Sequence, residues 1–218
     1  MSTFPGSPRL LKGGLVLLDA NTGQVQRIIS LQYNPDTLSR SLQVQAHTEG
    51  GDRSEALRVK GPPVETLKLE VDIDATDQLE RPDENRTAVE VGIHPQLAAL
   101  ETIVHARSAD LQANDTLAAA GTLEIVPMEA PLTLFVWSKN RVVPVRITEF
   151  SITEEAFDVA LNPIRAKVSL GLRVLTVDDV GFAHRGGSLF MSYLRNKEAL
   201  ARLTSTASLS TLGLQGLP

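Results

Sequence analysis

Residues 164–174, IRAKVSLGLRV, alternate apolar and polar side chains with a period of two. Successive side chains of a β-strand point to opposite faces, so this pattern predicts a strand with one buried face and one polar face. Residues 65–74, ETLKLEVDID, repeat the pattern, with an apolar residue at every second position from Leu67 to Ile73. Because antiparallel sheets can keep one face in water, the two segments favour an antiparallel sheet.

Two hairpins are predicted beside these strands. Residues 14–33 contain a turn at 21–23, and residues 131–153 contain a turn at 138–140. Pro144 cannot donate a hydrogen bond to a neighbouring strand, so we expect it at a sheet edge or at an irregularity. Together these segments predict about seven or eight strands.

Two helices are also expected. Residues 94–107, HPQLAALETIVHAR, place Pro95 in the first turn of a helix that can cover one end of the sheet. Residues 188–203, SLFMSYLRNKEALARL, predict a second helix with Ser188 as its N-cap. The expected apolar stripes are Leu97, Leu100, Ile103 and Val104 on the first helix, and Leu189, Phe190, Tyr193, Leu194, Leu200 and Leu203 on the second.

These elements predict a fold that is mainly β with α, an antiparallel β-barrel or sandwich with a flanking helix. The composition, with 42% hydrophobic and 22% charged residues, is typical of a globular protein that buries a core. We expect a domain over residues 1–180 and a C-terminal helical extension over residues 181–218.

Several polar segments are expected to connect these elements. The Gly-rich segment 47–63 and the acidic segment 75–92 are predicted surface loops. The glycine pairs at 50–51 and 186–187 are expected to act as flexible joints.

Composition excludes several classes of function. The chain has no cysteine, which rules out disulfides, thiolate metal sites and thiol nucleophiles. The net charge of −5 and the 4% aromatic content disfavour nucleic acid as the principal partner, because phosphate binding needs clustered cations and base stacking needs aromatic rings. No signal peptide and no membrane insertion are expected from the hydrophobicity pattern.

No catalytic, cofactor-binding or metal-binding residues are predicted, and we expect no enzyme. The four histidines lie far apart in the sequence, and the common phosphate-loop and nucleophile motifs are absent. Glu101 and His105 are four residues apart on a helix and are interpreted as a solvated pair. Alternation alone accounts for the row of Glu70, Asp72 and Asp74, and Trp137 is expected to be a packed anchor.

Two Asn-Pro steps, Asn34-Pro35 and Asn162-Pro163, are predicted to mark junctions between strands. The residue before a proline is displaced from the helical region, and an Asn side chain can bond to nearby backbone. A ligand site is the alternative interpretation. We expect that replacing both Asn162 and Pro163 by alanine disturbs assembly more than it destabilises the domain.

Several segments taken together resemble the tube-protein family of contractile injection systems, the phage-tail-like particles of bacteria. The resemblance rests on the segments LQYNPDTLSRSLQ, GPPVETLKLEVDIDATD, HPQLAALETIV and FSITEEAFDVALNPIRAKVSLGLRVL, and covers residues 13–178. Within the family the chain is most similar to the baseplate tube initiator, which usually carries a C-terminal LysM module. Residues 188–203 lack the Tyr-x-Val and Gly-Asp-Thr-Leu signatures of that module.

The resemblance implies a hexameric ring around a channel, at the baseplate, connecting the spike to the inner tube. The implied partners are further copies of the chain, the spike or hub protein, inner-tube subunits and other baseplate proteins. Assembly is expected in the bacterial cytoplasm as part of a contractile particle, with release of that particle left open. The residues expected at protein interfaces are Asn34, Pro35, Asn162, Pro163, Arg165, Phe190, Tyr193 and Leu194.

Two alternatives stay open. The first is the inner-tube subunit, which repeats many times along the particle and differs from the initiator in copy number. The second is a monomeric β-barrel that binds a small molecule, or an enzyme with a cryptic carboxylate site.

Overall fold

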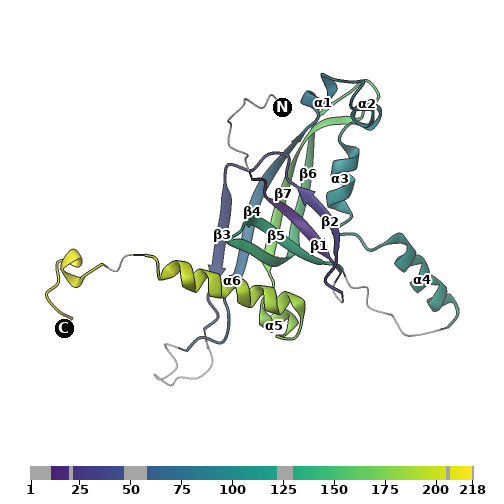
Figure 1. Cartoon of the computed structure of the whole chain (residues 1–218). Helices are drawn as coiled ribbons and strands as arrows, with labels where there is room; N and C mark the ends of the chain where they lie inside the picture. The colour runs from purple at the N-terminus through teal and green to yellow at the C-terminus, as the bar shows by residue number, and fades with distance from the viewer. Residues whose placement is uncertain (1–10, 20–21, 47–57, 122–129, 205–206, 218) are drawn as a thin grey trace.

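The computed structural model of the chain describes residues 11–19, 22–46, 58–121, 130–204 and 207–217 (Figure 1). In these ranges seven strands form one antiparallel sheet in the linear order β2-β1-β5-β6-β7-β4-β3, which confirms the prediction of a mainly β fold with helices. The strands are β1 Gly14–Leu18, β2 Val25–Ser30, β3 Leu38–Gln43, β4 Val64–Asp74, β5 Leu132–Ser138, β6 Arg141–Phe157 and β7 Pro163–Val174.

The sheet curls, so that β1, β2 and β5 cross over β4, β6 and β7 (Figure 1). Both predicted hairpins are present, because β1 pairs with β2 and β5 pairs with β6. In the first turn, Asn21 lies outside the described residues, and Thr22 donates to the Asp19 carboxylate. The order of pairing leaves β2 and β3 as the two edges of the sheet.

The core lies inside the curl and follows the predicted alternation. On β4 the apolar positions from Leu67 to Ile73 are buried, and on β7 those from Ala166 to Val174 are buried. Residues of β1 and β5 complete the same cluster, with Phe135 stacked on Trp137 at a ring-centroid distance of 5.8 Å. Trp137 is therefore a packed anchor, as expected.

Pro144 lies on β6, a central strand, and not at a sheet edge. Its carbonyl oxygen accepts a hydrogen bond from the Leu175 amide at 2.9 Å, so its nitrogen points to the same side, toward β7. The β6–β7 ladder begins only at Val145. The missing N–H therefore falls opposite Leu175 at the very end of the ladder and costs only one terminal hydrogen bond, which explains why a proline fits a central strand here.

The first expected helix is shorter than the sequence predicts. Helix α3, His94–Glu101, begins as expected with a proline in its first turn, but it ends six residues before the predicted end at 107. Leu97, Leu100 and Ile103 are buried, whereas Val104 is 47% exposed because the chain turns after Glu101.

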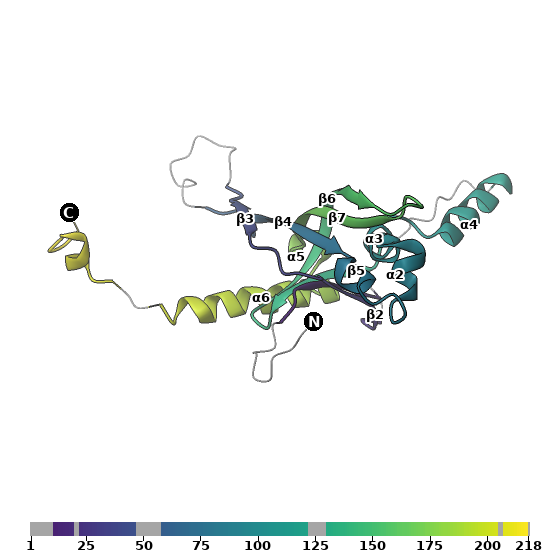
Figure 2. The same ribbon diagram turned by 90° about the horizontal axis from the view of Figure 1, so that it is seen from above.

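Within the described ranges, five further helical segments were not expected from the sequence. The segment 75–92 is not a loop, because it holds α1, Thr76–Leu79, and α2, Arg86–Val91. Helix α4, Ser108–Ala119, buries no residue and stands away from the sheet in both views (Figures 1 and 2). A short helix α5, Val177–Val180, precedes the C-terminal helix. A 3-10 turn, Leu209–Leu212, follows that helix.

Helix α6, Arg185–Ala201, begins three residues before the predicted N-cap. His184 caps it, because its Nδ1 accepts a hydrogen bond from the Gly186 amide at 3.0 Å. Gly186 and Gly187 are buried in the first turn and are not flexible joints; a Cβ on Gly187 would collide with the Gly181 carbonyl oxygen. The pair at 50–51 lies outside the described residues.

The apolar contacts of α6 with the sheet come from its first half. Phe190 and Tyr193 are buried in the main core, whereas Leu200 is 42% and Leu203 is 81% exposed. The helix continues past β3 and carries the C-terminal segment away from the sheet (Figures 1 and 2). The division at residues 180 and 181 stays a prediction, although α6 contributes to the core of the sheet.

Candidate assembly surfaces

The first Asn-Pro step fixes the link between β2 and β3. Asn34 Oδ1 accepts a hydrogen bond from the Gly13 amide at 2.8 Å, and its Nδ2 donates to the Leu11 carbonyl at 2.7 Å. The Asn34 side chain therefore holds the segment before β1 beside the β2–β3 link. The predicted strand junction is present, because β2 ends at Ser30 and β3 begins at Leu38.

The second step shapes the turn between β6 and β7. The Asp158 carboxylate accepts hydrogen bonds from the Ala160 amide and from the Asn162 amide, both at 2.8 Å, and from Asn162 Nδ2 at 2.9 Å. These bonds hold the pKa of Asp158 below its ordinary value of 3.8. Leu161 has a φ of 65°, a strained value for a residue with a branched side chain.

This turn presents apolar side chains to solvent. We call residues 157–161 the hairpin tip; Phe157 is 49%, Val159 107% and Leu161 78% exposed. Exposed large apolar groups on a well-defined loop are typical of contact surfaces. Pro163, by contrast, is buried, and its carbonyl oxygen accepts from the Ile93 amide at 2.9 Å.

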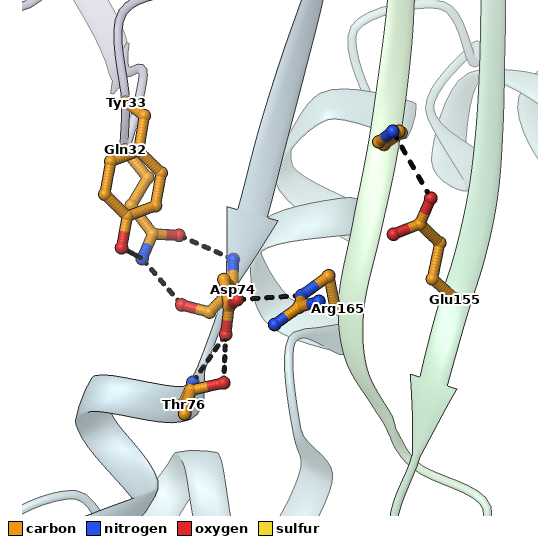
Figure 3. A network of polar contacts seen from close by, with 7 residues as sticks. Gln32, Tyr33, Asp74, Thr76, Glu155 and Arg165 are labelled. Carbon is orange, nitrogen blue, oxygen red and sulfur yellow. Dashed lines mark hydrogen bonds and ion pairs between the residues drawn. The ribbon is translucent and has the colours of Figure 1, made fainter.

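Arg165 lies in a polar network at the same end of the sheet (Figure 3). Its Nε donates to Asp74 Oδ2 at 2.8 Å, and Thr76 donates to the other carboxylate oxygen. Gln32 bonds to the backbone of Asp74 through both its amide nitrogen and its amide oxygen. Burial raises the pKa of Asp74, but the hydrogen bonds from Thr76 and the Arg165 charge outweigh it and lower the pKa below 3.8.

The row of acidic residues on β4 faces cations on β7, as expected for a solvated polar face. Asp72 stands opposite Lys167, and Asp74 stands opposite Arg165. Glu70 and Asp72 are exposed. In the described ranges no group of three or more potential ligands could hold a metal ion, and no helix is long and apolar enough to cross a bilayer.

A second polar cluster fastens α6 to the sheet, and we call it the Glu65 cluster. The carboxylate of Glu65, which is 3% exposed, accepts from the Tyr193 hydroxyl at 2.9 Å and from Lys197 Nζ at 2.7 Å. Lys197 Nζ also lies 4.1 Å from the centre of the Tyr193 ring, and Arg40 Nε lies 3.8 Å from the carboxylate. A buried carboxylate is tolerated when it is paired in this way.

Phe190 and Tyr193 were expected at a protein interface, yet both are buried within their own chain. These two side chains pack in the core, because they lie on the face of α6 that contacts the sheet. Leu194 is half-buried. An interface role for the eight residues as a set stays a prediction.

Pairing of edge strands between copies was expected from the resemblance, but the sequence did not identify which strands form the edges. β2 and β3 each have six residues and each leaves one row of backbone groups without a strand partner in the described part of the chain. Ile28 on β2 is 67% exposed and Leu42 on β3 is 46% exposed. An exposed edge of this kind can pair with a strand of another chain.

No protein-family model matches the chain, and no curated protein matches it. Among solved structures the chain is similar to one described as the tail of an empty GTA particle with C6 symmetry, at 11% identity and a TM-score of 0.29. The match covers 75% of this chain and 90% of that chain. A likeness at this level carries no argument about function.

Proposed function

We propose that the chain is a structural component of a phage-tail-like contractile injection system and forms a hexameric ring at its baseplate. In this role it is the tube initiator, which connects the spike to the inner tube. The sequence resemblance over residues 13–178 motivates the proposal. The observation that carries it is the open sheet, which in the described ranges ends on each side in a six-residue strand with no second strand partner.

The two free edges can join neighbouring copies. If β3 of one copy pairs with β2 of the next, both rows of unpaired N–H and C=O groups are satisfied. Ile28 and Leu42 lie on these strands, and their exposed side chains would be buried from solvent in the same contact. Different surfaces meet in such a contact, and a heterologous contact closes into a ring when the rotation between copies allows it.

The polar face of the sheet suits the wall of a water-filled channel. Across β4, β6 and β7 it carries exposed ion pairs, including Lys68 with Glu149 at 2.8 Å and Lys167 with Glu155 at 3.6 Å. The hairpin tip projects from one end of this face, where it can contact the spike or the first inner-tube ring. Assembly in the bacterial cytoplasm is part of the same proposal.

Cross-linking tests the ring, because the chain has no cysteine of its own. The double variant Ile28→Cys/Leu42→Cys is expected to give a ladder of covalent oligomers that ends at six. The control is Ile28→Cys/Val89→Cys, since Val89 on α2 is 45% exposed and matches Leu42 at 46%. A protein that stays monomeric at every concentration would overturn the ring and favour the small-molecule-binding alternative.

Copy number separates the initiator from the inner-tube subunit. Mass spectrometry of purified particles is expected to count one ring of this chain in each particle. Tens of copies would contradict the initiator role and favour the repeated subunit.

The C-terminal extension is tested by a truncation chosen from the structure. Deleting residues 181–218 would remove Phe190 and Tyr193 from the core. A chain that ends after Arg202 keeps both side chains and loses residues 203–218, of which every described residue is exposed. We expect this variant to fold but to weaken baseplate assembly, and normal particles would contradict that expectation.

A further inference from the structure

We propose that the C-terminal segment of each copy docks into an apolar groove on the neighbouring copy of the same ring. The segment comprises residues 203–217 and is called the arm. This inference rests on the proposed ring and names the partner of the C-terminal extension. The occupant of the groove is a second copy of this chain.

The arm is built to bury apolar surface but buries none on its own chain. It contains no charged residue, and every described residue of it is exposed. Leu209 and Leu212 begin and end a 3-10 turn, in which side chains three apart stand on the same face. Leu203, Leu212 and Leu217 are each more than 70% exposed.

The groove is at the packed end of the sheet and has a volume of about 450 Å³. Its lining is mostly apolar, with Arg146 as a charged member, and comes from the start of β5, the first half of β6, the residues after α3 and the segment around α5. The residues that form it include Val104, Leu132, Ile147, Leu175 and Val180, with His184 among the few polar groups. An uncharged arm suits this lining, because the arm itself brings no charge that must lose its hydration when it binds.

The direction of α6 brings the two surfaces together. Phe190, Tyr193 and Lys197 hold α6 on the sheet through the core and the Glu65 cluster, so the last turn of the helix has a fixed heading. That heading is past β3, the edge where the next copy joins (Figures 1 and 2). The groove is lined by the start of β5, which lies in the half of the sheet that ends in the other edge strand, β2. When β3 meets the β2 of a neighbour, the arm therefore reaches the side on which the neighbour carries its groove.

The test uses two single-cysteine variants mixed in equal amounts, so that any product joins different copies. Leu212→Cys with Val104→Cys is expected to form a cross-linked heterodimer under mild oxidation. The control replaces Val104→Cys by Val89→Cys, since the two valines are 47% and 45% exposed and Val89 does not line the groove. Equal yields from both mixtures would overturn the docking.

The edge cross-link between Ile28→Cys and Leu42→Cys is measured in parallel. An edge product without an arm product would overturn the docking while the ring stands. An arm product without an edge product would support the docking and overturn the β2–β3 contact between copies, and absence of both would overturn the docking and that contact.

A second measurement does not depend on cysteine chemistry. The variant Leu209→Ser/Leu212→Ser is expected to raise the concentration at which rings dissociate by roughly tenfold or more, because two leucines no longer leave water. Leu111→Ser on α4, where Leu111 is 51% exposed, is the control and is expected to leave that concentration unchanged. Equal dissociation of the two variants would contradict the proposal.

Discussion

The two ends of the β6–β7 hairpin are stabilised by different means. At the packed end Val143 and Val145 are buried, the hairpin lies between β5 and β4, and α6 covers the core. At the projecting end the tip is exposed, and its shape depends on hydrogen bonds around Asp158. One continuous β6–β7 ladder thus joins a region stabilised by apolar burial to a region stabilised by local hydrogen bonds. Mutations at the packed end should therefore lower the free energy of unfolding more than mutations at the tip.

The largest effect is expected for Leu172→Ala at the packed end. Leu172 is fully buried, so the substitution leaves a cavity and should lower the free energy of unfolding by roughly 2–5 kcal/mol. Leu161→Ala at the tip is the matched control and should change stability little, because Leu161 is 78% exposed. Urea unfolding followed by Trp137 fluorescence measures both, and equal losses would remove the distinction between the two ends.

A smaller loss is expected for Tyr193→Phe in the Glu65 cluster. The variant keeps the ring over the core but leaves one oxygen of a buried carboxylate without its hydroxyl donor, at a cost of about 1–3 kcal/mol. The control is Lys68→Met, which breaks an exposed ion pair and should cost at most about 1 kcal/mol. If Tyr193→Phe lowers the free energy of unfolding by no more than Lys68→Met does, the Glu65 cluster does not fasten α6 to the sheet.

A local effect is expected for Asp158→Ala at the projecting end. The amides of Ala160 and Asn162 lose their acceptor, so their hydrogen exchange should accelerate. Exchange on β4 and β7 should stay unchanged, and so should the melting temperature. Acceleration that spreads into the central strands would show that the tip and the packed end form one cooperative unit.

The smallest effect is expected from acid. The pKa of Asp158 and that of Asp74 are both lower in the folded chain than the ordinary 3.8. Each group therefore stabilises the fold fully above pH 3.8, and the contribution is lost as the pH falls through the lowered value. An NMR titration of the two carboxyl groups measures this directly, and a pKa above 3.8 for either would contradict it.

The strands could be predicted because alternation is a local signal that burial of one face enforces, as on β4 and β7. The helices α1, α2 and α4 could not, because they bury at most Ala88 among their residues and so carry no apolar stripe. His184 as a cap was missed because serine is the commoner N-cap residue.

The Glu65 cluster and the edges show where a single sequence falls short. Because side chains of a strand alternate between its two faces, Glu65 lies on the same face as Leu67 and Leu69. An acidic residue on the buried face was therefore a signal in the sequence that a buried partner must exist. Its partners on α6 lie more than 120 residues away in sequence, and only the packing of the helix identifies them. The exposure of β2 and β3 likewise depends on the order of strands in the sheet, which alternation does not specify.

The length of β6 has a mechanical consequence. With 17 residues the strand spans about 56 Å, and its partner β7 is bonded to β4 over nine residue pairs, Thr66 to Asp74 on the β4 side. A pull on the hairpin tip along the strand axis would load the β4–β7 and β5–β6 ladders in shear. Hydrogen bonds perpendicular to such a pull share the force and yield together rather than one after another. The hairpin is thus suited to transmit tension from its tip into the body of the sheet.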